Sequence, residues 1–193
     1  MDSFYAEWEL RELGIKKVGK SVLISKKASL YGADVIEIGD YVRIDDFCIL
    51  SGNIRIGSYI HISAYTSMYG GICGGIIMED YTTISSRCAV YACSDDYSGD
   101  YMTNAVIPAK YKNVREEKVE LKKYSIVGSG CTILPGVRIG EGAAVGAMSL
   151  VNRSLDEWGI YVGIPCRRMK ERKKNLLDKV AVFEKNCRGL VKL

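Results

Sequence analysis

The sequence has little histidine and proline and no long apolar run. Its 193 residues include one histidine, His61, and three prolines. A single histidine cannot supply the ligands of a three-histidine zinc site, and the seven cysteines lack the paired C-x-x-C spacing of a structural zinc site. No apolar segment approaches the roughly 18 residues that a membrane-spanning helix needs. The amino-terminal segment MDSFYAEWELREL carries charges where a secretory signal would be apolar. We therefore expect a soluble, cytoplasmic protein with reduced cysteines, no metal and no membrane contact.

Composition predicts one domain over residues 1–193. Hydrophobic residues make up 48% of the chain, enough for a sizeable core. The formal charge of +4 comes from 27 basic and 23 acidic residues, and the excess lies mostly in a carboxyl-terminal run that begins at Arg167. This balance is not typical of a nucleic-acid-binding protein.

Periodicity is the main signal. Aliphatic residues recur every six positions, with a two-residue slip after Leu30, a Gly-rich insert after Met68 and a loss of register after Val90, at Val18, Ile24, Leu30, Ile38, Ile44, Leu50, Ile56, Ile62, Met68, Met78, Ile84, Val90, Leu121, Val127, Ile133, Ile139, Val145 and Val151. A small or branched residue follows many of them four positions later, at Val42, Cys48, Ile54, Ile60, Thr82, Cys88, Ser125, Cys131, Val137, Ala143 and Ser149. Both sets should face inward.

A period of six fits neither a helix nor a single strand, but it fits short strands separated by turns. Stacked coils of such strands would bury a continuous ladder of aliphatic side chains, which no single coil can bury alone. Cys48, Cys88 and Cys131 are then small core residues rather than catalytic thiols.

The repeats IGDYVR, IGSYIH, VGSGCT, IGEGAA and VGAMSL resemble those of the hexapeptide-repeat acyltransferases. The resemblance covers roughly residues 18 to 170 and implies an all-β fold, a left-handed parallel β-helix with three hexapeptides per coil. We expect a cap over 1–17, the β-helix over 18–165, and a tail with a helix over 166–193. Fold alone does not establish activity. Metal-dependent carbonic anhydrases share this helix, but they need a histidine cluster that this sequence lacks.

The stretch VGSGCTILPGVRIGEGAAVGAMSLVNRSLDEWGIYVGIPCRRMKER resembles the coenzyme-binding half of the galactoside, maltose and nucleotide-sugar acetyltransferases. That resemblance implies acetyl-CoA as cosubstrate. It assigns coenzyme contacts to Ser129, Ala147, Asn152, Arg167 and Lys170, although Asn152 replaces the family's usual threonine. Ordinary coil packing remains the alternative for Ala147, and a solvated helix face for Arg167 and Lys170.

The segment KERKKNLLDKVAVFEKN places Leu176, Val180 and Phe183 at helical spacing. We expect this helix to cover the open last coil, and a short helix near Phe4 to Leu13 to cover the first.

The repeat is lost from about residue 94 to 120, where the sequence begins SDDYSGD. In the family, a loop leaves the β-helix near this point and carries a catalytic histidine. Alignment on the family puts Asp95 or Asp96 at that position. Either carboxylate could accept the proton of an attacking amine, and neighbouring carboxylates, with Asp100, could raise one pKa or hold an ammonium group. A solvated turn is the alternative. His61 is a further candidate base, and substrate-assisted proton transfer needs none.

An acidic cluster favours a cationic amine as acceptor over a neutral hydroxyl. The stretches RIDDFCILSG, SDDYSGDYMTN and WGIYVGIPC resemble acetyltransferases of O-antigen and glycan pathways that act on amino-deoxy nucleotide sugars. The resemblance implies N-acetylation of a sugar nucleotide, with dTDP as the expected nucleotide, by a homotrimer with sites between subunits. It places Tyr65, Tyr69 and the Gly-rich segment 69–75 at the acceptor, and the charge of Asp100 makes this residue a further candidate contact for the amine. O-acetylation of a sugar or polysaccharide, and a non-enzymatic scaffold, remain alternatives.

Overall fold

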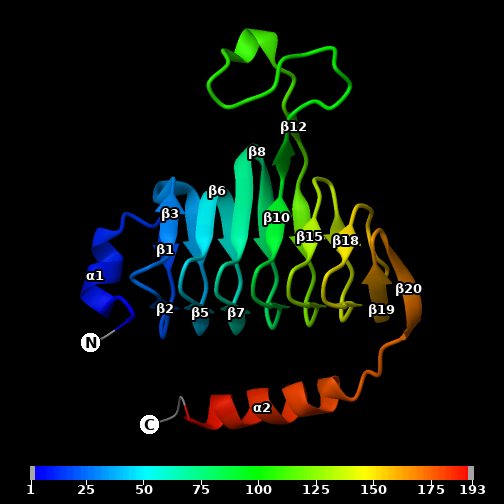
Figure 1. Ribbon diagram of the computed structural model, residues 1–193. Helices are drawn as coiled ribbons and strands as arrows, with labels where there is room; N and C mark the ends of the chain where they lie inside the picture. The colour runs from blue at the N-terminus through cyan, green and yellow to red at the C-terminus, as the bar shows by residue number, and fades with distance from the viewer. Residues whose placement is uncertain (1–2, 191–193) are drawn as a thin grey trace.

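A computed structural model describes residues 3–190. Its strands wind into stacked coils that form three faces (Figure 1). The first face contains β2 (Leu23–Ile24), β5 (Val42–Ile44), β7 (Ile60–Ile62), β9 (Thr83–Ile84), β14 (Ile126–Val127), β17 (Ala144–Val145), β19 (Gly159–Gly163) and β20 (Cys166–Glu171). The second contains β3 (Ser29–Tyr31), the first parts of β6 (Ile49–Ile56) and β8 (Ser67–Met78), β10 (Ala89–Tyr91), β15 (Thr132–Ile133) and β18 (Leu150–Val151). The third contains β1 (Lys17–Val18), β4 (Ile36–Ile38), the later parts of β6 and β8, β13 (Val119–Leu121) and β16 (Arg138–Ile139).

Neighbouring coils pair in parallel and in register. Leu50 of β6 pairs with Met68 of β8, which in turn pairs with Val90 of β10. Each is the third repeat position after the one before it, so one coil holds three repeats and places each repeat residue directly on that of the neighbouring coil. The predicted left-handed β-helix of hexapeptide coils is confirmed.

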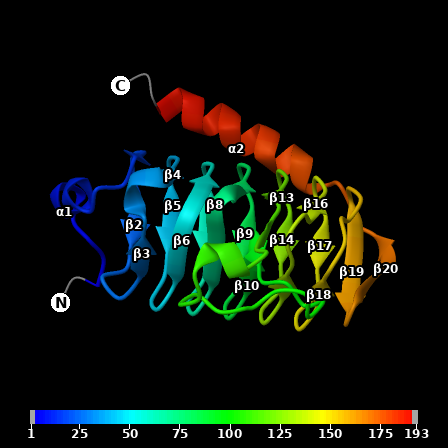
Figure 2. The same ribbon diagram turned by 90° about the horizontal axis from the view of Figure 1, so that it is seen from above.

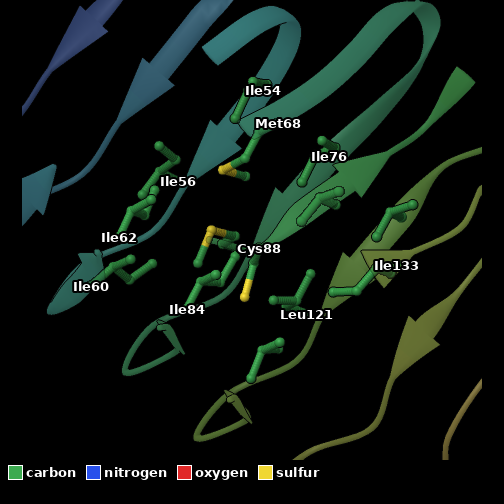
Figure 3. Close-up of a cluster of buried hydrophobic side chains, with 14 of the residues drawn as sticks. Ile54, Ile56, Ile60, Ile62, Met68, Ile76, Ile84, Cys88, Leu121 and Ile133 are labelled. Atoms are coloured by element: carbon green, nitrogen blue, oxygen red, sulfur yellow. The ribbon is translucent and has the colours of Figure 1, made fainter. Parts of the chain in front are cut away.

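The core is the predicted ladder of side chains (Figure 3). Ile44, Ile62 and Ile84 are fully buried, as are most of the other repeat positions. Val18 and Leu30 in the first coil are only partly buried, because they lie at the open end of the stack. Each enclosed Ile or Leu contributes about 1.5–3 kcal/mol relative to an exposed position.

Cys48, Cys88 and Cys131 belong to this core, as predicted. The thiol of Cys48 donates to the carbonyl of Ser63 at 3.2 Å, and burial raises its pKa to about 11. Such a thiol is protonated at neutral pH and is a poor nucleophile.

Glycine after the repeat residue serves close coil contact rather than a left-handed turn. A Cβ on Gly39 would lie 2.6 Å from the carbonyl oxygen of Gly57 in the next coil. The left-handed conformation falls two residues later, on Tyr41, Tyr59 and similar positions with φ near +60°. Because these residues repeat with the coils, their rings stack above one another.

The two ends of the β-helix are closed differently. Helix α1 (Glu7–Glu12) buries Leu10 against the first coil, as expected. At the other end β20 turns back and pairs antiparallel with β19.

The expected position of helix α2 (Leu176–Leu190) over the last coil is wrong. The helix runs back along the side of the β-helix (Figure 2). There Phe183 packs edge-on against Tyr59 at 5.3 Å between ring centroids, and Tyr81 donates to the Glu184 carboxylate at 3.0 Å. The stacked tyrosines provide an apolar strip for α2, while β20 already covers the end.

The predicted interruption leaves the β-helix as an excursion over residues 95–114 (Figure 1). Strands β11 (Cys93–Ser94) and β12 (Arg115–Glu116) pair antiparallel at its base. Two short 3-10 turns, η1 (Ala33–Val35) and η2 (Ala109–Tyr111), complete the elements, the latter within the excursion. Neither helix in the described part of the chain is long and apolar enough to cross a membrane.

Candidate active site

A cavity of about 640 Å³ lies between the second face and the excursion. Its lining residues are Tyr69, Tyr91, Cys93, Ser94, Asp95, Tyr97, Ala105, Lys112, Val114, Thr132, Leu134 and Pro135. The cavity exists because the excursion leaves from the edge of the second face and folds over that edge. A largely apolar cavity with a few polar groups is typical of a small-molecule site.

Asp95 lines the cavity and Asp96 does not. One Asp95 oxygen, Oδ2, accepts from the backbone N–H of Asn104 at 3.1 Å, which holds the carboxylate at the cavity wall. Asp95 follows β11 directly, so the antiparallel ribbon with β12 fixes its position.

Asp96 organises the excursion itself. Its Oδ1 accepts from the backbone N–H of Ser98 at 2.7 Å and from the Ser98 hydroxyl, and its Oδ2 accepts from Asn113 Nδ2 at 3.1 Å. These bonds, led by that from the Ser98 hydroxyl, lower the pKa of the Asp96 carboxyl. Asp100 also lies outside the cavity lining, and its N–H donates to the Ser98 hydroxyl at 3.1 Å. Asp96 and Asp100 therefore belong to a hydrogen-bonded turn around Ser98, which is the alternative that the sequence left open for this segment.

An aromatic pair forms part of the cavity wall. Tyr69 and Tyr91 are in register on β8 and β10, and their rings stack at 5.2 Å. Burial raises the pKa of Tyr91, so its hydroxyl stays neutral. Lys112 adds a positive group to the wall, with its Nζ 3.1 Å from the carbonyl oxygen of Asn104.

The structure does not bring His61 or Tyr65 to this cavity within one chain. His61 lies on β7 of the first face, with Nε2 2.7 Å from Asp45 Oδ2. Burial raises the pKa of the Asp45 carboxyl, but hydrogen bonds from Arg43 and His61 outweigh it and hold that pKa below its usual range. Tyr65 stacks on Phe47 at 4.9 Å, at the corner between the first and second faces.

The residues predicted to bind the coenzyme fall into separate places. Ser129 and Ala147 lie in consecutive turns between the first and second faces, and the Ser129 carbonyl accepts from Met148 N–H at 2.8 Å. Arg167 and Lys170 are exposed on β20. Asn152 follows β18 at the opposite edge of the second face, in the coil above Leu134. Ser129, Ala147 and β20 are thus near the carboxyl-terminal coils, and only Asn152 approaches the cavity.

Sequence reasoning missed Tyr91, Tyr97, Lys112, Thr132 and Leu134. The repeat carried a signal for the first of these, because Tyr91 follows Val90 as Tyr69 follows Met68. Tyr97 and Lys112 belong to the excursion, where no periodicity places a side chain.

Within residues 3–190 no group of three or more His, Cys, Asp or Glu side chains is arranged to hold a metal ion.

Comparison with known proteins gives no match to a protein-family model. The chain is 44% identical over 190 residues to the dTDP-4-amino-4,6-dideoxy-D-glucose acyltransferase of Escherichia coli, which covers 97% of this chain and 98% of the relative. It is 26% identical over 138 residues to a putative lipopolysaccharide biosynthesis O-acetyl transferase, WbbJ, of Escherichia coli K12, covering 67% of this chain and 65% of that protein.

Among solved structures, AntD of Bacillus cereus is an N-acyltransferase crystallised with dTDP and 3-hydroxybutyryl-CoA. It is 55% identical to this chain, with a TM-score of 0.94, and the match covers 97% of this chain and all of AntD. A hexapeptide-repeat acetyltransferase of Vibrio cholerae, at 17% identity and a TM-score of 0.58, shares the fold. Nearly the whole length of this chain thus aligns with dedicated enzymes of one kind, and it belongs to the hexapeptide-repeat acyltransferases, within the group of dTDP-amino-sugar acyltransferases.

Proposed function

We propose that this enzyme transfers an acyl group from acyl-CoA to the 4-amino group of a dTDP-4-amino-4,6-dideoxy sugar. The observation that carries the proposal is the full-length similarity to an enzyme named for this acceptor. The cavity beside Asp95 supports it, because the cavity combines aromatic walls with one carboxylate and one lysine. Aromatic rings suit a pyrimidine base, and the carboxylate suits an amine.

Asp95 is the favoured general base. The sugar nitrogen attacks the thioester carbonyl carbon, and its proton passes to the Asp95 carboxylate as the C–N bond forms. The tetrahedral oxyanion is stabilised by a backbone N–H. The C–S bond then breaks, and the CoA thiolate leaves and takes up a proton.

Variants of AntD support this choice. A serine and an aspartate ten positions apart in AntD were each substituted in structures with dTDP or a dTDP-sugar and coenzyme A. Here Ser85 precedes Asp95 by that spacing, and Ser86 precedes Asp96. Since Asp95 lines the cavity and Asp96 does not, the pair Ser85 and Asp95 is favoured.

We further propose a homotrimer with the site between subunits. Ser85 follows β9 at one edge of the second face and Asp95 follows β11 at the other, with β10 between them. If both side chains act on one substrate, they come from two chains. His61 and Tyr65, at the first face and its corner with the second, would reach an acceptor site in the same way.

The distribution of charge supports burial of the first and second faces. Outward residues of the third face follow the register Lys17, Glu37, Arg55, Ile77, Glu120 and Arg138. From β9 onward, the first face instead presents Thr83, Ile126, Ala144 and Ile160. The second face presents Ser67, Ala89, Thr132 and Leu150. The first face also presents Arg43 and His61, on β5 and β7. Its uncharged stretch from β9 onward and the second face favour subunit contact, whereas the third face suits water.

For the coenzyme we retain Ser129, Ala147, Asn152, Arg167 and Lys170. Small side chains in the turns leave room along the backbone for the pantetheine arm. The exposed guanidinium of Arg167 and ammonium of Lys170 suit the phosphates. We propose acetyl-CoA as donor. Because AntD was crystallised with 3-hydroxybutyryl-CoA, longer acyl-CoA donors should be compared with acetyl-CoA.

The product would enter O-antigen or other surface-glycan synthesis, and the reaction would take place in the cytoplasm, where CoA thioesters are available. WbbJ, a putative lipopolysaccharide biosynthesis enzyme, supports this setting.

The test is thiol release from acetyl-CoA and 3-hydroxybutyryl-CoA against amino-deoxy sugars linked to dTDP, UDP and GDP, beside neutral sugars. Turnover with a dTDP-linked 4-amino sugar is expected. Release only with neutral sugars would replace the proposal with O-acylation, and no release with any acceptor would contradict it.

A further inference from the structure

The Gly-rich turn of β8 is closed by a carboxylate from β12, the strand on which the chain returns from the excursion. The backbone N–H groups of Ile72, Cys73 and Gly74 donate to Glu116 Oε2 at 3.2, 2.5 and 3.0 Å. Consecutive N–H groups of this kind form a concave anion site. In this protein the anion is the chain's own side chain.

Two glycines of the turn allow this close packing. Gly71 has φ +66°, and a Cβ there would lie 3.1 Å from the Glu116 carboxyl carbon. A Cβ on Gly74 would lie 2.7 Å from the carbonyl oxygen of Ala92. The segment YGGICGG therefore shapes a turn that receives Glu116.

Glu116 also belongs to the base of the excursion. On β12 it pairs with Cys93 of β11, two residues before Asp95. Cys93, Ser94 and Asp95 form one wall of the cavity, and Tyr69, at the start of the Gly-rich turn, forms another. Glu116 itself does not line the cavity, so it links two walls from behind.

We propose that Glu116 is a positioning residue for the acceptor site: its carboxylate fixes the turn over residues 70–75 against the ribbon that carries Asp95. The inference rests on the proposed function, because it assigns the acceptor to the cavity. Displacement of a catalytic group by about 1 Å costs up to a hundredfold in rate, so a tether at this point matters for turnover.

The first test compares Glu116→Gln with the wild-type chain. Glutamine keeps one acceptor oxygen but turns an NH2 group toward the backbone donors. We expect kcat/KM for the amino-sugar nucleotide to fall about tenfold or more, while KM for acyl-CoA stays within about twofold. The matched control is Glu120→Gln, because Glu120 pairs with Lys118 on the third face, away from the cavity. It should change neither constant.

A second variant, Gly71→Ala, disturbs the same contact from the turn. Since both substitutions act on one interaction, their effects on kcat/KM should be less than additive in the double variant. Additive losses, or a Glu116→Gln enzyme with unchanged acceptor constants, would overturn the inference. Equal changes in the kinetic constants for both substrates, together with a large drop in melting temperature, would also overturn it, because they would indicate a purely stabilising role. Absence of turnover in the wild-type chain would instead contradict the proposed function.

Discussion

At the scale of single residues, Asp95 and Asp96 are neighbours with different surroundings. Asp95 lines the cavity and accepts one hydrogen bond from the backbone N–H of Asn104. Asp96 is engaged by Ser98 and Asn113 within the excursion. A substitution that removes charge but keeps shape should therefore separate the two positions.

We expect Asp95→Asn to lower kcat by about a hundredfold or more, because the amide cannot accept the amine proton. Asp96→Asn should stay within about threefold, because its side-chain oxygen still accepts from the Ser98 N–H. The measurement is steady-state thiol release at saturating acyl-CoA. A melting curve of each variant is the control, because both chains should fold as the wild-type chain does. Equal losses at both positions would contradict the assignment.

Sequence reasoning reached Asp95 but could not separate it from Asp96. The pair was found because the repeat stops beside it, a signal that locates a segment and not a side-chain direction. The partner Glu116 carried no signal, since 42 residues separate it from Gly74 and only the return of the excursion brings them together. The roles of Asp95, His61 and the coenzyme residues stay predictions until variants are measured.

At the scale of elements, helix α2 is held by a column of rings. Tyr59, Tyr81 and Tyr124 stack at 5.0 and 5.5 Å, and Phe183 meets the first two edge-on. The hydrogen bond from Tyr81 to Glu184 fixes the helix along the column. Burial and the Glu184 carboxylate raise the pKa of Tyr81, so its hydroxyl remains a donor at any physiological pH.

Loss of these contacts should lower the free energy of unfolding by a small but measurable amount. We expect Tyr81→Phe and Phe183→Ala each to lower the free energy of unfolding by about 1 kcal/mol. Val182→Ala is the control, because Val182 is 59% exposed on the same helix, and it should change stability by less than about 0.5 kcal/mol. Urea titration at one protein concentration provides the comparison. An equal loss for all three variants, with Val182→Ala included, would contradict the tyrosine column as the source of this stabilisation.

The Gly-rich turn should loosen in acid. Hydrogen bonds from the backbone, led by that of Cys73, lower the pKa of Glu116. A lowered carboxyl pKa stabilises the turn above the unfolded value of about 4.3, and that stabilisation is lost as pH falls through the folded pKa. We expect amide hydrogen-exchange protection at residues 72–74 to hold from neutral pH to about 4 and to fall below it. The Glu116→Gln chain serves as control and should lack this dependence. Protection in the wild-type chain that persists well below that pH would argue against the carboxylate.

The strands were predictable and the position of α2 was not. Six-residue periodicity reports which side chains face inward, so Ile44, Ile62 and Ile84 could be assigned from sequence. The tyrosine column arises from turn residues that meet only when coils stack, and no local pattern links Phe183 to Tyr59. For the same reason, the sequence predicted an amphipathic helix but not the surface against which it packs.

For the whole molecule, the three faces differ in charge, and this difference underlies the proposed trimer. The chain should have a solution mass three times its 21.4 kDa, as measured by light scattering after size-exclusion chromatography. Ile126→Glu places a charge on the first face beside Ala144 and should reduce the mass to that of one chain. Ile77→Glu adds the same charge to the third face, between Arg55 and Glu120, and should leave the trimer intact. A wild-type monomer, or dissociation by Ile77→Glu alone, would contradict the proposed arrangement.

The excursion over residues 95–114 begins and ends at the same point of the β-helix. Cys93 and Glu116 pair at its base, while β10 and β13 on either side pair with the same neighbour, β8. The register of the coils is therefore set independently of the segment between Cys93 and Glu116. On the proposed function, exchange of this segment between relatives should replace one wall of the acceptor cavity, while Tyr69, Tyr91 and Thr132 of the coils keep the other wall unchanged.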